Sequence, residues 1–330
     1  MKNIILRLKT SDKNTMALFF IAVFIFIVMG ILSPKQFLSL TNLQGMGIQF
    51  PEFGILSFGM MLAMISGGID LSLVGIANLS GIVGTVVMLR MGGGIESIPF
   101  GILAALLTGL LCGIFNGILI GYLKIPPMLV TLCGLQLFTG LGLAITKGPA
   151  LTGLPEEFGN IANGTILGIP ITVILFVIVA IVISYLLKST VYGQHLSFKG
   201  TNEIASRYSG INNLKVIIIT YGISGILGSI SGILMASHYN SAKSDYGTSF
   251  TLLSLLIVVL GGTNPDGGKG KVIGVTLSVI VLQLVSSAFN IMRVNSFVKT
   301  FVWGLILIFI MVITSLIDNK HTQRKVKKQC

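Results

Sequence analysis

Residues 98–120 read IPFGILAALLTGLLCGIFNGILI, an apolar run without a single charged side chain. A helix needs about 20 apolar residues to cross a hydrocarbon core roughly 30 Å thick, so this run predicts a transmembrane helix. Apolar side chains gain little by touching each other in lipid, and close backbone approach becomes the source of helix association. The run therefore predicts a helix packed tightly in a bundle, because one face presents small residues at Gly101, Ala105, Gly109, Gly113, Gly117 and Gly121, a spacing that recurs at Ser224, Gly228, Gly232 and Ala236.

The rest of the chain shares this apolar character. Of its 330 residues, 53% are hydrophobic and 10% charged, with a mean hydropathy of +0.94, whereas a soluble domain carries roughly 25% charged residues. We expect an all-α fold, a polytopic transmembrane helix bundle forming one membrane domain over 15–318, between basic tails at 1–14 and 319–330. The ten expected spans are 15–32, 46–66, 71–89, 98–120, 126–146, 169–187, 214–238, 250–261, 272–290 and 297–317.

The basic residues predict the orientation of the bundle. If both termini lie on one side, that side holds 16 of the 22 Lys and Arg residues and the other side holds 6. Cytoplasmic loops carry such an excess, so we expect both termini in the cytoplasm. The net charge of +12 is then explained by topology and by contact with membrane lipid, and we expect no nucleic-acid partner.

A glycine pair interrupts the apolar pattern after the second span, in the stretch Ser66-Gly67-Gly68-Ile69-Asp70-Leu71-Ser72. Asp70 or Ser72 can cap the helix that follows. An acid at membrane depth is costly and otherwise belongs to a polar pathway. Both interpretations of Asp70, a helix cap or a residue of the path, stay open.

The longest polar stretch between spans is the segment 188–213. Within it, Thr201 to Gly210 predicts a short helix with an N-cap at Thr201 or Asn202, an acid in the first turn and a C-terminal glycine. Ile204 and Tyr208 share one face, which suits docking into a groove on a partner; a plain interfacial loop helix is the alternative. The residues of the predicted docking segment are Thr201, Asn202, Glu203, Ile204, Ala205, Arg207, Tyr208 and Gly210.

A glycine-rich stretch, Gly261 to Lys271, follows the eighth span. Its spacing fails the phosphate-loop pattern, since a glycine follows Gly268-Lys269 where Ser or Thr is required. We expect a sharp turn. Unwound backbone at such breaks is tolerated where protein or water satisfies it, and paired broken helices point to a transport site. The predicted path and gate residues are Gly67, Gly68, Asp70, Ser72, Asn116, Thr131, Gly261, Gly262, Thr263 and Asn264.

No arrangement of residues indicates catalysis. His195, His238 and His321 fall on different segments, the three cysteines lack metal or redox spacing, and no Ser/His/Asp pattern appears. We therefore expect no catalytic residues, no metal and no cofactor. An ion-coupled secondary transporter is disfavoured because only Glu52 and Asp70 bring acids near the membrane. An intramembrane enzyme is disfavoured because no nucleophile–base pair is present.

Three of these motifs together resemble the ribose-type ABC importer permeases, the monosaccharide and autoinducer-2 class. The resemblance is carried by Gly67-Gly68-Ile69-Asp70-Leu71-Ser72, by Gly200 to Ile211, and by Val259 to Thr263 with Gly267-Gly268-Lys269-Gly270. One departure is Leu73-Val74-Gly75-Ile76, effectively one residue longer than the family's Val-Gly-Ser, which turns a helix face by about 100°. This departure leaves the substrate open.

The resemblance implies a ten-helix permease of the vitamin-B12-importer type (type II) in the bacterial inner membrane. It implies a dimer with a second permease copy, identical or related, two cytoplasmic ATP-binding subunits and an extracytoplasmic solute-binding protein. The segment 188–213 becomes the coupling segment, and ATP hydrolysis is expected in the partner rather than in this chain. The expected cargo is a pentose or similar monosaccharide, with autoinducer-2 or a nucleoside as alternatives. We further expect the two glycine breaks to shape the inner gate, without a high-affinity solute pocket in the bundle.

Overall fold

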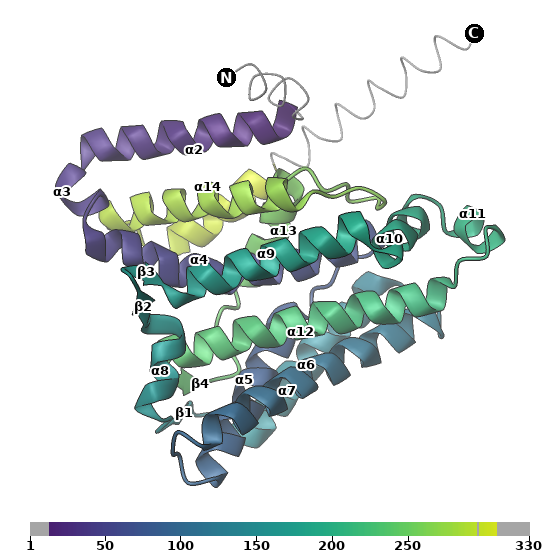
Figure 1. Cartoon of the computed structure of the whole chain (residues 1–330), viewed down its shortest axis with the longest axis horizontal. Helices are drawn as coiled ribbons and strands as arrows, with labels where there is room; N and C mark the ends of the chain where they lie inside the picture. Colours follow the sequence, from purple (N-terminus) through teal and green to yellow (C-terminus); the bar gives the residue numbers. More distant parts are fainter. Residues whose placement is uncertain (1–12, 296, 309–330) are drawn as a thin grey trace.

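Three helices form the centre of the protein in the computed structural model, which describes residues 13–295 and 297–308 (Figure 1). They are α4 (Leu40–Ile65), α5 (Leu73–Arg90) and α12 (Asn213–Tyr239). Within the most apolar 18-residue stretch of each helix, 83% of the residues are buried in α4 and 72% in α5 and in α12. Helices that are apolar all round and buried by their neighbours form the core of a membrane bundle. These three therefore make the scaffold on which the other helices pack.

Five further helices of 19 to 25 residues lie around this core. In the most apolar 18-residue stretch of each of these helices, only 17% to 56% of the residues are buried. Their outer faces therefore remain apolar and uncovered, as expected for surfaces in contact with lipid. Figure 1 shows α2 alongside α14 on one flank and α6 and α7 on the other. The five are α2 (Lys13–Leu32), α6 (Ser97–Gly121), α7 (Pro127–Thr146), α9 (Ile171–Ser189) and α14 (Val272–Ile291).

The described residues thus contain 8 helices long and apolar enough to cross a membrane. Two further apolar helices are shorter, α13 (Phe250–Leu260) and Phe297–Ile308. Each of the ten expected spans coincides with one of these helices, although the last, 297–317, runs beyond residue 308 and so partly outside the described residues. The expected tail 319–330 lies wholly outside the described residues. Of the expected tail 1–14, residues 1–12 lie outside them.

Small residues set the closest helix contacts. A methyl group on Gly117 would lie 2.9 Å from Cα of Ile218, and one on Gly113 or Gly109 would overlap the α12 carbonyl groups of Tyr221 or Gly225. The small face of α6 therefore packs on α12 from Gly109 onward, whereas Gly101 lies against Gly84 and Met88 of α5, and both contacts confirm the predicted tight packing. On another face of α12, Gly228 lies against Ile76 and the carbonyl of Leu73 in α5.

Short elements close one end of the bundle. They are α3 (Pro34–Phe37), α8 (Glu156–Asn163) and four two-residue strands, of which β1 pairs antiparallel with β4 and β2 with β3. Ser237 Oγ donates to the carbonyl of Phe158 at 2.5 Å, so α8 is tied to the end of α12. The strands are β1 (Leu151–Thr152), β2 (Thr165–Ile166), β3 (Ile169–Pro170) and β4 (Ser241–Ala242).

The opposite end holds α10 (Val191–Thr201) and α11 (Glu203–Tyr208), which Figure 1 shows on the side of the bundle away from α8. The sequence predicts one short helix in this segment, and the structure adds α10 before it. Two glycines within α10, Gly193 and Gly200, argue against a helix by propensity. Tertiary contact explains Gly200, because a methyl group there would overlap the carbonyl oxygen of Ile65.

Candidate functional site

The glycine pair after α4 ends that helix in a Schellman motif. Gly67 has φ +85°, its N–H donates to the carbonyl of Met64 at 2.9 Å, and the N–H of Gly68 donates to the carbonyl of Ala63 at 3.0 Å. A left-handed residue at this position satisfies helix carbonyls that would otherwise have no donor, and glycine adopts it without strain. The break is therefore a defined stop within the membrane domain.

The glycine-rich stretch repeats the same geometry at the end of α13. Gly262 has φ +79°, its N–H donates to Val259 at 3.0 Å, and the N–H of Thr263 donates to the carbonyl of Val258 at 3.2 Å. The turn that follows is closed by the N–H of Asn264, which donates to Lys269 O at 3.0 Å. The expected sharp turn is confirmed.

These two breaks and the end of α10 meet at one place, which we call the three-way junction: Ile65–Gly68, Lys199–Thr201 and Thr263–Gly270. Lys199 is buried and its Nζ donates to the carbonyl of Ser66 at 2.8 Å. The N–H of Gly268 donates to the carbonyl of Ile65 at 2.9 Å. A hydrogen bond from a charged group contributes about 1.5–3 kcal/mol, so the end of α10 is firmly joined to the break after α4.

A second group of polar residues surrounds the break, and we call it the Asp70 cluster: Asp70, Ser72, Asn116, Thr131 and Ser224. Asp70 is fully buried, and its carboxylate accepts from Ser72 Oγ at 2.5 Å and from Ser224 Oγ at 2.7 Å. Asn116 Nδ2 donates to Ser72 Oγ at 2.8 Å, and Thr131 Oγ1 donates to the carbonyl of Ile69 at 2.9 Å. The cluster thus ties the break to α6, α7 and α12.

Asp70 does not occupy the N-cap position of α5, although its Oδ1 accepts from the backbone N–H of Ser72 at 3.1 Å. The N-cap position is Ser72, whose side chain makes no cap hydrogen bond and whose hydroxyl donates to Asp70. Asp70 instead receives donors on both carboxylate oxygens, which offsets the cost of burying the group. Its role in a solute path stays a prediction.

The short helix α11 projects from the junction. Asn202 occupies its N-cap and accepts from the N–H of Ala205 at 2.9 Å, so of the two predicted caps Asn202 is the correct one. Gly210 ends the helix with φ +81°. The side chains of Ile204 and Tyr208, four residues apart, are 70% and 89% exposed. An exposed aromatic and aliphatic pair on a rigid, capped helix is a surface suited to a partner.

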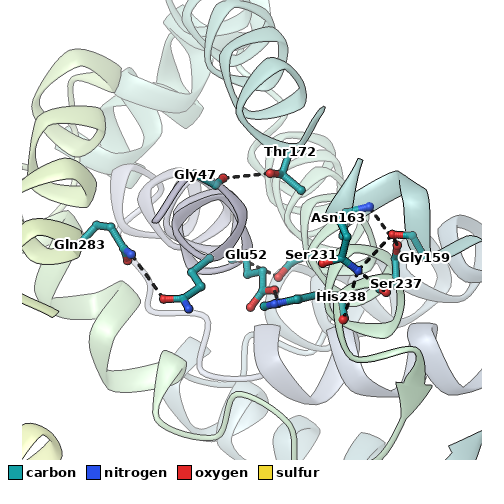
Figure 2. A network of polar contacts seen from close by, with 11 residues as sticks. Gly47, Glu52, Gly159, Asn163, Thr172, Ser231, Ser237, His238 and Gln283 are labelled. Carbon is teal, nitrogen blue, oxygen red and sulfur yellow. Dashed lines mark hydrogen bonds and ion pairs between the residues drawn. The ribbon is translucent and has the colours of Figure 1, made fainter. Parts of the chain in front are cut away.

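Near the other end of the bundle lies a cavity of about 510 Å³ between α4, α12, α13, α14 and the helix Phe297–Ile308. None of the ten predicted path and gate residues lines it. At its wall, Glu52 Oε1 and His238 Nδ1 are 2.5 Å apart and hydrogen-bonded (Figure 2). Gln283 Nε2 donates to Gln49 Oε1 at 3.5 Å across the same cavity. The cavity therefore has two pairs of polar groups in its lining.

The sequence did not reveal this cavity. The sequence marks Glu52 as an acid near the membrane and His238 as an isolated histidine, and 186 positions separate the two residues. The sequence feature that indicates a polar site here is Glu52 itself, because an ionisable residue inside a membrane span needs a polar partner within the bundle. Among the described residues, no group of three or more His, Cys, Asp or Glu side chains is placed to hold a metal ion.

Comparison with known proteins places this architecture in a family. The model for the branched-chain amino acid transport system / permease component matches residues 42–311. The ribose import permease of Bacillus subtilis strain 168 is 32% identical over 308 residues, covering 92% of both chains. The autoinducer 2 import system permease LsrD of Enterobacter sp. strain 638 is 31% identical, covering 88% of this chain and 89% of its own. The D-allose transport permease of Escherichia coli K12 is 28% identical and covers 91% of both chains.

No solved structure matches the chain significantly. The family model covers most of the chain, including the break after α4, the segment of α10 and α11 and the glycine-rich turn. Together with the polytopic helical fold, the match shows that this chain belongs to the branched-chain amino acid transport system / permease component family, as a permease of the ribose type from ABC importers.

Proposed function

We propose that this chain is the membrane subunit of an importer that moves a monosaccharide into the cytoplasm, driven by ATP hydrolysis in a partner subunit. Relatives named for ribose and for D-allose import support a sugar as the cargo. Autoinducer-2 is the second candidate, because a relative named for its import matches almost as well. In this proposal the chain itself hydrolyses nothing.

The proposed topology has ten spans, with the α11 end in the cytoplasm together with both termini. Eight long apolar helices and the two shorter ones support the count, if α13 and Phe297–Ile308 also cross. The vitamin-B12-importer-like arrangement (type II) is part of the same proposal, as are a second permease copy, an extracytoplasmic solute-binding protein and contact of the outer helices with membrane lipid. On this topology α8 faces the outside.

The observation that supports coupling most directly is the hydrogen bond from Lys199 Nζ to the carbonyl of Ser66. It connects the segment bearing the exposed pair Ile204 and Tyr208 with the break that follows α4. A partner that binds α11 and moves during its ATP cycle would pull on this break through Lys199. The break after α13 would move with it, because the N–H of Gly268 donates a hydrogen bond to the carbonyl of Ile65.

Docking is tested by cross-linking in the assembled complex. A chain freed of Cys112, Cys133 and Cys330 and bearing Tyr208→Cys should cross-link to the ATP-binding subunit with a short bifunctional reagent. The matched control is Tyr185→Cys, an exposed tyrosine on α9. Equal yields from the two positions, or no cross-link from position 208 in a complex that copurifies, would remove α11 as the contact.

A further inference from the structure

The polar groups of the cavity are of the kind that bind hydroxyl groups. Gln49 and Gln283 each offer an amide donor and acceptor, and the paired Glu52 and His238 add a carboxylate and an imidazole at the same wall. Planar side chains of this type can bond two neighbouring hydroxyls of a sugar at once. Glu52 and Gln283 are buried, and burying such groups is costly unless they have polar partners.

Aromatic rings form another part of the lining. Phe250 and Trp303 belong to α13 and to the helix Phe297–Ile308, and Tyr239 follows His238 at the end of α12. The C–H face of a sugar ring is apolar and packs on an aromatic ring, while its hydroxyls need polar partners. Pockets for small molecules commonly enclose about 300–1,000 Å³, and this cavity of about 510 Å³ lies within that range.

Two helices run from the cavity to the three-way junction. Glu52 lines the cavity and Ser66 ends the same helix α4, a separation of about 20 Å at a helical rise of roughly 1.5 Å per residue. Leu253 lines the cavity on α13, whose other end is the break at Gly261 and Gly262. A change at the junction would therefore shift two walls of the cavity together.

We propose that this cavity binds a monosaccharide within each copy of the chain, as a weak site on the route of the cargo. The inference rests on the proposed function, because it is that function which supplies a sugar as the ligand. Gln49, Gln283 and the Glu52–His238 pair hold the hydroxyls, and Trp303 covers a ring face. The site is expected to be weak, since a cargo held tightly in the bundle would be released slowly to the other side.

Trp303 gives a direct readout because it is the only tryptophan in the chain. We would reconstitute the full-length protein in proteoliposomes and titrate it with D-ribose and with D-allose through the millimolar range. The expected result is a saturable change in tryptophan fluorescence for at least one of the two sugars. Gln49→Ala and Gln283→Ala should each raise the half-saturating concentration about fivefold, as expected for one lost hydrogen bond.

The matched control is Gln44→Ala, which removes another glutamine of α4 whose Nε2 donates to the carbonyl of Gly168 and which does not line the cavity. It should leave the half-saturating concentration unchanged. Because Gln49 is exposed, its removal should not disturb folding. An absent fluorescence response to both sugars, or equal half-saturating concentrations in the Gln44 and Gln49 variants, overturns the proposal.

Failure of the site and failure of the proposed function give different results. If a sugar is taken up in an ATP-dependent way but leaves Trp303 fluorescence unchanged, the proposed importer function stands and the proposed sugar site in the cavity is rejected. If Trp303 fluorescence responds saturably, the Gln49 variant weakens that response, and no ATP-dependent uptake occurs, the sugar site in the cavity stands and the proposed importer function is rejected.

Discussion

Lys199 Nζ lies 2.8 Å from the carbonyl oxygen of Ser66 and donates a hydrogen bond to it, although 133 positions separate the two residues. The same ammonium group lies 3.5 Å from Glu203 Oε2, at the first turn of α11. One buried cation thus contacts both the first turn of α11 and the break inside the membrane domain. In the proposed coupling, a displacement of α11 would be transmitted to α4 through this contact.

Removing the cation should uncouple the two processes. Lys199→Met keeps the length of the side chain but leaves the carbonyl of Ser66 without its donor, at a cost of about 1–3 kcal/mol. We expect ATP hydrolysis by the complex to continue while sugar uptake falls at least severalfold. Lys215→Met is the control, since it removes an exposed lysine just inside α12. Uptake and hydrolysis falling in equal proportion in the Lys199 variant would argue against transmission through this bond.

The exposed pair on α11 should dominate partner binding. Truncating a buried aromatic anchor of an interface typically costs about 2 kcal/mol or more, whereas rim residues contribute less. We expect Tyr208→Ala and Ile204→Ala to lower solute-stimulated ATP hydrolysis more than Glu203→Ala or Arg207→Ala, with normal amounts of permease in the membrane. Wild-type stimulation in the Tyr208 variant would reduce α11 to an interfacial loop helix.

The two glycine breaks should not tolerate a β-branched side chain. At Gly68 a methyl group would lie 2.7 Å from Tyr221 Oη and 2.8 Å from Cβ of Pro127, and Gly262 has φ +79°. Gly68→Val and Gly262→Val are expected to abolish uptake while the affinity of the binding protein is unchanged. Gly140→Val is the control, because nothing lies within 4 Å of a methyl group at that position. Near-normal uptake in both break variants, with expression checked, would mean that the breaks are only turns.

The orientation can be read with two single cysteines in a chain freed of its own three. Gly159→Cys in α8 should react with a membrane-impermeant reagent in intact cells, and Tyr208→Cys only after permeabilisation. Both sites have room for the reagent, since Tyr208 is exposed and the nearest atom to a methyl group at Gly159 is 4.0 Å away. Labelling of Gly159→Cys only after permeabilisation would overturn the topology of ten spans.

Much of the helical fold follows from local pattern. The glycine spacing at Gly109, Gly113 and Gly117 predicts tight packing, and the structure places that face on α12. The cap at Asn202 and the stop at Gly210 were likewise predictable, because both effects act within a few residues. The second span was expected to begin at residue 46 but begins at Leu40, where the Ser39 side chain accepts from the N–H of Asn42.

Contacts between distant segments could not be predicted in this way. Nothing near Gly200 in the chain indicates that it lies against the carbonyl of Ile65, so a helix over α10 was not expected. The Glu52–His238 pair and the Asp70 cluster likewise depend on how helices pack. The sequence shows the motifs at Asp70, at Glu203 and at Gly268 one by one, but only the folded chain shows that the glycine breaks and α10 meet at one junction.

The central claim is that ATP hydrolysis in a partner drives a sugar through this chain. It is tested in proteoliposomes that contain the permease and its ATP-binding subunit, with the solute-binding protein and labelled D-ribose or D-allose on the opposite side from ATP. The account predicts that one of these sugars accumulates only when hydrolysable ATP is present and that Tyr208→Ala stops the accumulation. Accumulation driven by an ion gradient without ATP, or none of either sugar with every component present, would contradict it.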